Sequence, residues 1–409
     1  MFAAGVEQLL IDIMISISHY SVNRLYRPAD NTAPLMAFGD GLTLPERETY
    51  NTSELGNFCV CLRTSAYVSS AEREAIMIFR RLMTIQWKNV FGMSRALAKR
   101  SGRSSASVFF DFVDCYRKRG ATWFNYMNFA FDLKRDPAIR DTYATEYKDN
   151  GVMFRCNAPE IIESIRDKGL FNAAYREFIG RDYIDLRKTD REDYERFIAR
   201  FDEVFAKPAL GCGGDGIERL TRDEAKGQYD RLVREGRVVV EEVVRQHSAL
   251  NAVNASSVNT IRTCTCINDQ GDVTVLYMVF RIGRKSSFVD NMSAGGLYTK
   301  LSDDGRIIHP CYSAVGFGTV YTHHPDTNLP FVGIQLPMID QVKELVIRAA
   351  KKNPGTRYIG WDVAITPDGP VIIEANERPG CDLPQTFAHS DTGRGLVDAY
   401  EKALSIKLR

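Results

Sequence analysis

Near the C-terminus the sequence reads "GPVIIEANERPG", from Gly369 to Gly380, and this stretch decides the fold. The β-branched run at residues 371–373 predicts a buried strand. A carboxylate, Glu374, and an amide, Asn376, interrupt that strand two residues apart, so both side chains are expected on one face. A strand this apolar needs a reason to carry two polar side chains on one side.

The stretch just upstream predicts the partner strand of a hairpin. Residues 358–366, "YIGWDVAIT", precede the turn "PDG", and pairing around it brings Asp362 opposite residue 373 or 374, allowing for a bulge. Asp362, Glu374 and Asn376 would then gather two carboxylates and an amide, a set that suits a hard cation such as Mg²⁺. The alternative is an exposed edge hairpin with solvated polar residues, and the apolar run before Glu374 argues against it.

Composition restricts the class of protein. The 409 residues are too many for one ordinary core, so two or three domains or lobes are expected. Hydrophobic content of 44% and charged content of 26% are typical of a soluble globular protein. The formal charge of +1 argues against a general nucleic-acid or membrane-surface binder. No apolar run is long enough to span a membrane, and the N-terminal stretch lacks the pattern of a signal peptide.

The nine cysteines are an odd number, and none forms a Cys-x-x-Cys motif. Two pairs, Cys59/Cys61 and Cys264/Cys266, have a spacing that puts both thiols on one face of a strand. Buried reduced thiols are favoured over a metal site or disulfides. A reducing, cytoplasmic location fits this cysteine usage best.

A glycine-rich segment, "AKPALGCGGDG", occupies residues 206–216. Lys207 ends a predicted strand, and backbone N–H groups of a flexible loop can approach phosphates while the lysine supplies charge. The loop glycines are Gly211, Gly213, Gly214 and Gly216. The segment is neither a Walker A nor a Rossmann motif, because no Gly-Lys-Ser/Thr follows and no helix begins on the loop. A plain loop rich in glycine is the alternative.

Several charged residues lie in apolar surroundings. Glu241 and Glu242 follow a run of valines in "VVVEEVV", where they would accept hydrogen bonds from an exocyclic amine or ribose hydroxyls, or simply be exposed edge acids. Arg262 and Arg281 lie in apolar predicted strands and need a partner, which a phosphate, a carboxylate or an internal salt bridge would provide. Lys168, in "RDKGLF", would by itself be a surface residue.

The predicted secondary structure changes along the chain. A short strand is expected at residues 11–18, and residues 70–147 show a helical pattern rich in basic and aromatic residues. Helices and strands alternate after about residue 150. Capping boxes are predicted at Thr189 with Glu192 and at Thr221 with Glu224.

Together and in this order, these motifs resemble the ATP-grasp superfamily. The order is a lysine in Asp-Lys, a Lys-Pro strand with a glycine loop, a Glu-Glu strand, two arginine strands, an aspartate and Glu-x-Asn. The segments "DKGLF", "SSVNTIRTCTCI", "FRIGRKSSFVDNMSAGGLY" and "YIGWDVAITPDGPVIIEANERPG" resemble the sugar-transfer-associated ATP-grasp family more closely. The resemblance covers about residues 110–400.

The resemblance implies an α+β fold in which two α+β lobes clasp ATP, preceded by a largely helical N-terminal region. Residues 1–150 would be this helical region, with an acceptor or partner role. Residues 151–409 would form the ATP-grasp domain, divided into a glycine-loop lobe, 151–245, and a magnesium and catalytic lobe, 246–409.

The resemblance also implies roles for individual residues. Lys168 and Lys207 would bind phosphates, and the 211–216 loop would close over them. The adenine and ribose pocket would be lined by Glu241, Glu242 and Val244; Mg²⁺ would be held by Asp362, Glu374 and Asn376; and the transferred phosphoryl group or substrate carboxylate would face Arg262, Arg281 and Asn291.

The activity that follows from the resemblance is ATP-dependent ligation of a small-molecule carboxylate to an amine through an acyl phosphate, with a sugar acid and an amino acid among the expected substrates. An ATP-grasp-type kinase acting on a hydroxyl and a nucleotide-binding partner protein without turnover are the alternatives. His323 or His324 is a candidate general base, although a loop histidine is more often solvated. The sequence leaves the oligomeric state open.

Overall fold

The computed structural model describes residues 87–211, 213–284, 287–288, 290–292 and 295–408. The chain divides into two compact units, residues 1–91 and 92–409, and only residues 87–91 of the first unit are described. The strand expected at residues 11–18, the Cys59/Cys61 pair and the helical pattern before residue 87 lie outside the described residues.

A group of helices comes first, which confirms the predicted helical region before the sheets wherever the chain is described. The helices are α4 (Trp87–Ser101), α5 (Ser105–Arg119), α6 (Trp123–Asn128), α7 (Pro137–Asp141) and α8 (Glu146–Cys156). Helix α5 begins at an N-cap, Ser104, whose side chain accepts a hydrogen bond from the N–H of Ser107. It ends at Gly120, which has the left-handed φ of 63° that a C-cap favours.

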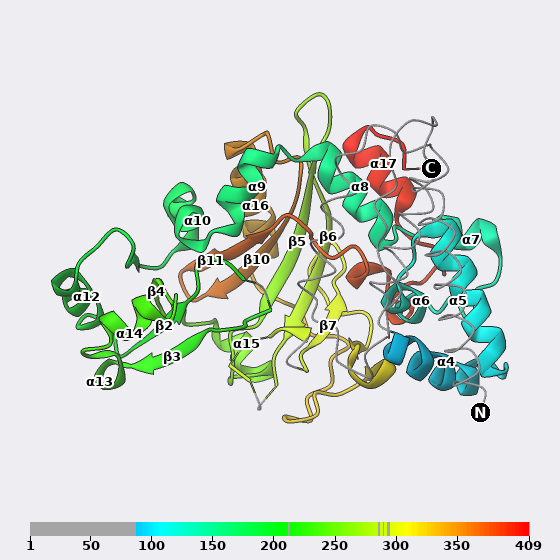
Figure 1. Ribbon diagram of the computed structural model, residues 1–409, viewed down its shortest axis with the longest axis horizontal. Helices are drawn as coiled ribbons and strands as arrows, with labels where there is room; N and C mark the ends of the chain where they lie inside the picture. The colour runs from blue at the N-terminus through cyan, green and yellow to red at the C-terminus, as the bar shows by residue number, and fades with distance from the viewer. Residues whose placement is uncertain (1–86, 212, 285–286, 289, 293–294, 409) are drawn as a thin grey trace, which may run out of the picture. The chain divides into compact units, whose positions relative to one another are not determined.

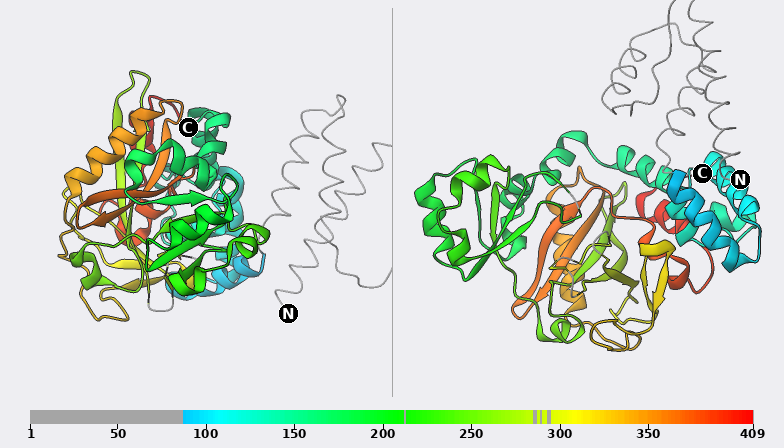
Figure 2. Two further views of the ribbon diagram at one scale, coloured as in Figure 1. Left: turned by 90° about the vertical axis from the view of Figure 1, so that its left-hand side faces the viewer. Right: turned by 60° about the horizontal axis from the view of Figure 1, so that its bottom comes forward.

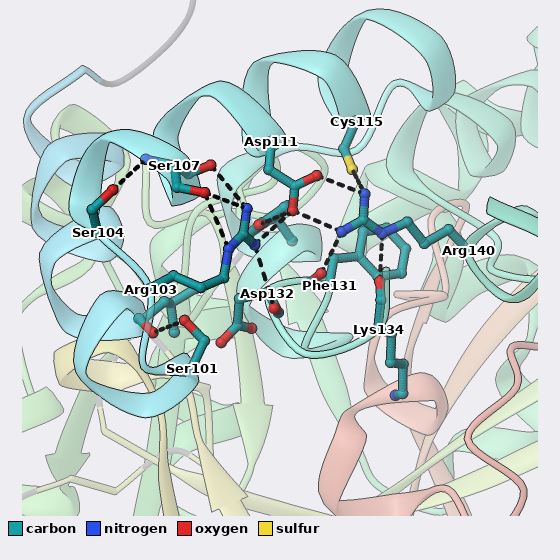
Figure 3. Close-up of polar contacts among 12 residues, drawn as sticks. Ser101, Arg103, Ser104, Ser107, Asp111, Cys115, Phe131, Asp132, Lys134 and Arg140 are labelled. Carbon is teal, nitrogen blue, oxygen red and sulfur yellow. Dashed lines mark hydrogen bonds and ion pairs between the residues drawn. The ribbon is translucent and has the colours of Figure 1, made fainter. Parts of the chain in front are cut away.

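A partly buried polar cluster around Asp111 joins helices α5, α6 and α7 (Figure 3). Arg140 of α7 donates to both carboxylate oxygens of Asp111, at 2.9 and 2.7 Å. Arg103 donates to the same carboxylate at 3.0 Å, and the Tyr126 hydroxyl of α6 donates at 2.7 Å. Although burial opposes it, hydrogen bonds from Arg140, Tyr126 and Arg103 hold the pKa of Asp111 well below its usual value. One carboxylate therefore connects α5 to α6, α7 and the turn before α5.

A small antiparallel sheet follows, with strand order β1-β4-β2-β3. Its strands are β1 (Tyr183–Asp185), β2 (Glu203–Lys207), β3 (Glu218–Thr221) and β4 (Val239–Glu242). Helices α12 (Arg191–Ile198), α13 (Arg222–Ala225) and α14 (Tyr229–Arg234) pack on it, and their apolar side chains share a core with the strands. In β2 the buried residues Val204 and Ala206 alternate with Phe205 and Lys207, so the last two face away from this core.

The two predicted capping boxes have different outcomes. Thr221 and Glu224 form the expected box, and the helix predicted there is interrupted at Gly227, whose φ is +73°. The box at Thr189 is wrong, because Asp190 caps α12 by accepting a hydrogen bond from the N–H of Asp193 at 2.9 Å. The Thr189 hydroxyl donates instead to the carbonyl of Asp185.

A large sheet of seven antiparallel strands has the order β11-β10-β5-β6-β7-β8-β9. The strands are β5 (Thr260–Ile267), β6 (Val273–Ile282), β7 (Leu297–Lys300), β8 (Cys311–Ser313), β9 (Thr319–Tyr321), β10 (Tyr358–Thr366) and β11 (Gly369–Asn376). The remaining helices are α9 (Pro159–Arg166), α10 (Lys168–Ala174), α11 (Arg176–Ile179), α15 (Ser248–Val253), α16 (Ile339–Lys352) and α17 (Val397–Leu404). Mixed helices and antiparallel sheets confirm the predicted α+β class, and the small sheet lies beyond β11 (Figure 1).

Helices cover both faces of the large sheet (Figure 2). Helix α16 packs on one face, and α8 and α17 pack on the other. Alternation along β10 sends Trp361 toward α16 and Asp362 to the opposite face. On β5 the thiols of Cys264 and Cys266 share that second face and are buried and free, as predicted for this pair. In the part of the chain that the structure describes, no helix is both long and apolar enough to cross a membrane.

Candidate active site between the two sheets

The hairpin of β10 and β11 has the predicted pairing. Asp362 lies opposite Glu374, and the next pair is Val363 with Ile372. Ile373 is therefore the extra residue of a β-bulge, which bends a strand and changes the direction of its side chains. As a result the consecutive residues Ile373 and Glu374 line the same pocket, where a regular strand would turn one of them away.

Asp362 lies among the two strand arginines. It is only 3% exposed. Arg262, which lies directly opposite it on β5, donates to both of its carboxylate oxygens. Arg281 of β6 donates to the same carboxylate at 2.7 Å. The third nitrogen of Arg262 donates to the carbonyl of Pro379 at 2.9 Å. The expected partner of both arginines is thus an internal carboxylate, one of the alternatives that the sequence left open.

Arg281 also reaches the loop that follows β6. Its guanidinium forms an ion pair with Asp290 at 2.9 Å and donates to the side-chain oxygen of Asn291. The second oxygen of Asp290 accepts hydrogen bonds from the backbone N–H and the hydroxyl of Thr260. Two carboxylates and one amide therefore fix the direction of Arg281.

The two facing carboxyl groups differ in pKa. Burial raises the pKa of Asp362, but the charges of Arg262 and Arg281 more than offset it, so the pKa lies well below the usual value. Burial and the neighbouring charge of Asp362 raise the pKa of Glu374, against the smaller effects of Lys168 and Arg262. Two carboxylates so close together disfavour each other's charge, and a bound cation would relieve this repulsion.

The structure brings the predicted cation ligands together. The Asn376 amide nitrogen lies 3.5 Å from Asp362 and 3.4 Å from Glu374. No group of three His, Cys, Asp or Glu suited to a metal occurs among the described residues, so a cation here would depend on the amide oxygen and water. Mg²⁺ commonly takes one or two carboxylates and keeps several waters, so the donor set fits it.

On the small-sheet side, Lys207 forms an ion pair with Glu241 at 2.5 Å. Glu241 is 2% exposed and also accepts hydrogen bonds from Asn172, at 2.7 Å, and from Arg181. Burial opposes its ionisation, but the charges of Arg181 and Lys207 hold the pKa of Glu241 well below its usual value. Glu241 therefore serves first as the anchor of Lys207.

Lys168 begins α10 directly after Asp167, whose side chain caps the helix. The Lys168 ammonium donates to the carbonyl of Gly211 at 2.9 Å, and its backbone N–H donates to the carbonyl of Ala209. The first predicted phosphate-binding lysine is thus tied to the glycine loop. All four predicted loop glycines have positive φ, which explains the residue type: Gly211, Gly213, Gly214 and Gly216.

These side chains surround two adjoining pockets of about 110 and 310 Å³. The smaller pocket takes in most of the predicted site: Lys168, Lys207, Gly214, Glu241, Glu242, Val244, Arg281, Asn291, Asp362 and Glu374. Gly211 and Asn376 line the larger pocket, which shares both lysines and Glu374 with the smaller one. Gly213, Gly216 and Arg262 line neither pocket, and Arg262 lies behind Asp362.

Sequence reasoning missed several residues at the site. Phe205 of β2 and Phe288 of the loop after β6 have ring centroids 5.9 Å apart and both line the smaller pocket, as does Asp290. Arg181 and Asn172 support Glu241. Alternation along β2 would have put Phe205 on the same face as Lys207, whereas the contacts of the other residues join separate elements and do not follow from a local pattern.

His324 does not have the accessibility of a general base. It is fully buried, with Nε2 3.1 Å from the carbonyl of Gly283, and Nδ1 accepts hydrogen bonds from the N–H groups of Asp326 and Thr327. His324 therefore fixes its own loop. His323 is exposed, and its Nδ1 lies 3.0 Å from the Thr322 hydroxyl.

Comparison with protein families finds a match in the second half of the chain. Residues 226–390 match the model of the sugar-transfer associated ATP-grasp family, which confirms the predicted resemblance over that range. The matched range contains Glu241, both strand arginines and the β10–β11 hairpin. No curated protein sequence matches this chain.

Three of the solved structures that match this chain share little sequence with it. The ATP-grasp ligase PsnB, in a complex with Mg and ADP, is 17% identical, with 62% of this chain and 57% of that chain covered at a TM-score of 0.32. D-cycloserine synthetase DcsG is 15% identical, with 62% of this chain and 74% of that chain covered at a TM-score of 0.38. D-alanyl-alanine synthetase A from Vibrio cholerae is 13% identical, with 59% of this chain and 66% of that chain covered at a TM-score of 0.37. The chain thus spans less than two thirds of the first and third of these structures.

Proposed function

We propose that the protein is an ATP-dependent ligase that joins a small-molecule carboxylate to an amine, a proposal supported by the match of residues 226–390 to the sugar-transfer associated ATP-grasp family. One observation carries the proposal. The cations Lys168 and Lys207 and the carboxylates Asp362 and Glu374 line the same pocket from its two sides. This arrangement offers positive charge to phosphate oxygens and carboxylate oxygen to a cation, as a metal-bound nucleoside triphosphate requires.

The residues that would hold Mg²⁺ are Asp362, Glu374 and Asn376. When bound there, Mg²⁺ would neutralise charge on the phosphate oxygens. Lys168 and Lys207 would bind the phosphates, and the glycine loop would cover them. The apolar wall, with Phe205 and Val244, would receive the base of the nucleotide, in line with the apolar lining of most small-molecule pockets.

The proposed chemistry has two steps. An oxygen of the substrate carboxylate attacks the γ-phosphorus, the bond to the β-phosphate oxygen breaks, and ADP leaves. The amine nitrogen then attacks the acyl carbon and phosphate leaves with the bonding electrons, while the amine loses a proton to solvent or a base. Arg281 and Asn291, which line the pocket, would contact the transferred phosphoryl group or the substrate carboxylate. Arg262 would act indirectly, by orienting Asp362.

The test is ADP release from Mg·ATP across paired carboxylates and amines, with mass spectrometry of the product. Sugar acids combined with amino acids are the first pairs to try. ADP release that needs both substrates, and is lost in Glu374→Gln, is the expected result. A stable phosphorylated hydroxyl compound would identify a kinase instead. Mg·ATP binding without turnover for any pair would favour the nucleotide-binding partner protein.

A further inference from the structure

One buried arginine, Arg181, connects the two sides of the pocket. It lies between α11 and β1, and its side chain is only 2% exposed. Its Nε and one terminal nitrogen donate to Glu241 of the small sheet, at 3.0 and 3.2 Å. Its terminal nitrogens also donate to the carbonyls of Ile372 and Ile373 of the large sheet, each at 2.8 Å. A planar guanidinium can satisfy such divergent acceptors, and an ammonium cannot.

On the small-sheet side, Arg181 shares the charge of Glu241 with Lys207. Both cations reach the same oxygen of Glu241. With Arg181 in place, the carboxylate is already compensated, and the ammonium of Lys207 retains capacity to bind a further anion. Without Arg181, Lys207 would be the remaining full cation on a buried carboxylate, which would hold it tightly.

On the large-sheet side, Arg181 holds the bulge. Ile373 is the extra residue of that bulge and directly precedes Glu374. A bulge residue lacks regular pairing in the ladder, so its carbonyl needs another donor. Arg181 supplies that donor, and it thereby fixes the strand at the point that sets the direction of the Glu374 side chain.

We infer that Arg181 is a positioning residue that sets the placement of the Lys207 ammonium relative to the Glu374 carboxylate, and so couples the phosphate and cation ends of the pocket. The inference deepens the proposed function and rests on it. The inference predicts that replacing Arg181 changes both the affinity for ATP alone and the gain in affinity that Mg²⁺ gives. Lys207 contributes to the binding of ATP with or without Mg²⁺, and Glu374 contributes only when Mg²⁺ is present. Arg181 contributes to the binding of ATP alone and also to the gain from Mg²⁺.

The experiment measures the Kd for ATP by calorimetry, with and without Mg²⁺, in the full chain. Lys207→Met should weaken both values by similar factors, and Glu374→Gln should weaken only the value with Mg²⁺. Arg181→Met should weaken the binding of ATP alone severalfold, and it should reduce the gain in affinity from Mg²⁺ at least tenfold. Arg200→Met is the matched control: Arg200 is an exposed arginine paired with Asp182, and its replacement should leave both values unchanged.

A double-mutant cycle separates positioning through Glu241 from a general structural role. If Arg181 acts on Lys207 through Glu241, Arg181→Met combined with Glu241→Gln should weaken ATP binding without Mg²⁺ no more than Arg181→Met alone. Additive losses, or an unchanged Kd in folded Arg181→Met, would overturn the inference. If that variant does not fold, Arg181→Lys takes its place, because it keeps the charge but loses the divergent donors; wild-type affinities in it would equally overturn the inference. Absence of Mg·ATP binding by the wild type would instead refute the proposed function.

Discussion

Asp362 on β10 lies directly opposite Glu374 on β11, and the pKa values of the two carboxyl groups are shifted in opposite directions. Asp362 is buried and Glu374 is half-buried, and loss of contact with water raises the pKa of both carboxyl groups, so burial alone does not explain shifts in opposite directions. Arg262 and Arg281 donate to Asp362, whereas Glu374 faces the like charge of Asp362. The charge of Asp362 therefore stabilises the fold, whereas the charge of Glu374 destabilises it until a bound cation offsets the repulsion.

The first prediction separates these two carboxylates by stability. Asp362→Asn leaves two buried arginines without their shared anion and should lower the free energy of unfolding by roughly 3 kcal/mol. Glu374→Gln removes an unfavourable charge and should change it by less than about 1 kcal/mol, or raise it. Urea unfolding followed by circular dichroism measures both. Equal losses in the two variants would show that the arginines do not discriminate between the carboxylates.

The second prediction concerns two helical glycines. A Cβ on Gly169 of α10 would lie 2.4 Å from both Asp185 and Arg187, which form an ion pair beside it. Gly169→Ala should therefore destabilise the protein, although alanine is favoured over glycine in a helix by about 1 kcal/mol. Gly151→Ala in α8 is the control, because a Cβ there meets no atom within 4 Å. It should stabilise by roughly 0.5–1 kcal/mol, so thermal unfolding should move the two midpoints in opposite directions.

The third prediction is a pH dependence of stability. Burial raises the pKa of Asp149 to about 7, against the hydrogen bond that it accepts from the Tyr358 hydroxyl. The unfolded carboxyl ionises near pH 4, whereas the folded one keeps its proton to about pH 7. This group therefore makes stability fall as the pH rises from about 4 to 7, with no further loss above that range.

Asp149→Asn keeps an acceptor for Tyr358 and removes the titration. Its stability relative to wild type should rise across this pH window, by a few kcal/mol at most. Unfolding in urea at a series of pH values gives the difference. A difference that is independent of pH would mean that Asp149 ionises normally in the folded protein.

The fourth prediction tests the polar cluster of Figure 3. Asp111→Ala leaves Arg103 and the buried Arg140 without their carboxylate and should cost roughly 3 kcal/mol. Asp114→Ala on the same helix removes an exposed pair with Lys118 and should cost less than about 0.5 kcal/mol. Thermal unfolding compares the two variants. A loss of similar size in both would show that burial does not strengthen the Asp111 interactions.

Local pattern was sufficient to predict the hairpin at the candidate site. Two strands joined by a short turn have few possible registers, so the sequence alone placed Asp362 opposite residue 373 or 374, and the structure pairs it with Glu374. The loop glycines were predictable for a similar reason, since their positive φ angles are a property of the loop itself.

What the sequence could not predict depends on residues that are distant along the chain. Two of the partners of Glu241, Arg181 and Asn172, lie 60 and 69 residues away from it, and no local pattern links them to it. Thr189 shows a local limit: its neighbour Asp190 is also a good capping residue and caps the helix, while the Thr189 hydroxyl donates to the carbonyl of Asp185, four residues earlier.

Arg181 has one more consequence, which concerns contacts between molecules. Strand β11 is at the edge of the large sheet, and an edge strand with free carbonyl groups is a template for another extended chain. The guanidinium occupies the carbonyls of Ile372 and Ile373 on this strand and makes that part of the edge unfit for such pairing. The side chain to which we assign the ordering of the pocket therefore also occupies two of the carbonyl groups through which β11 could pair with another strand.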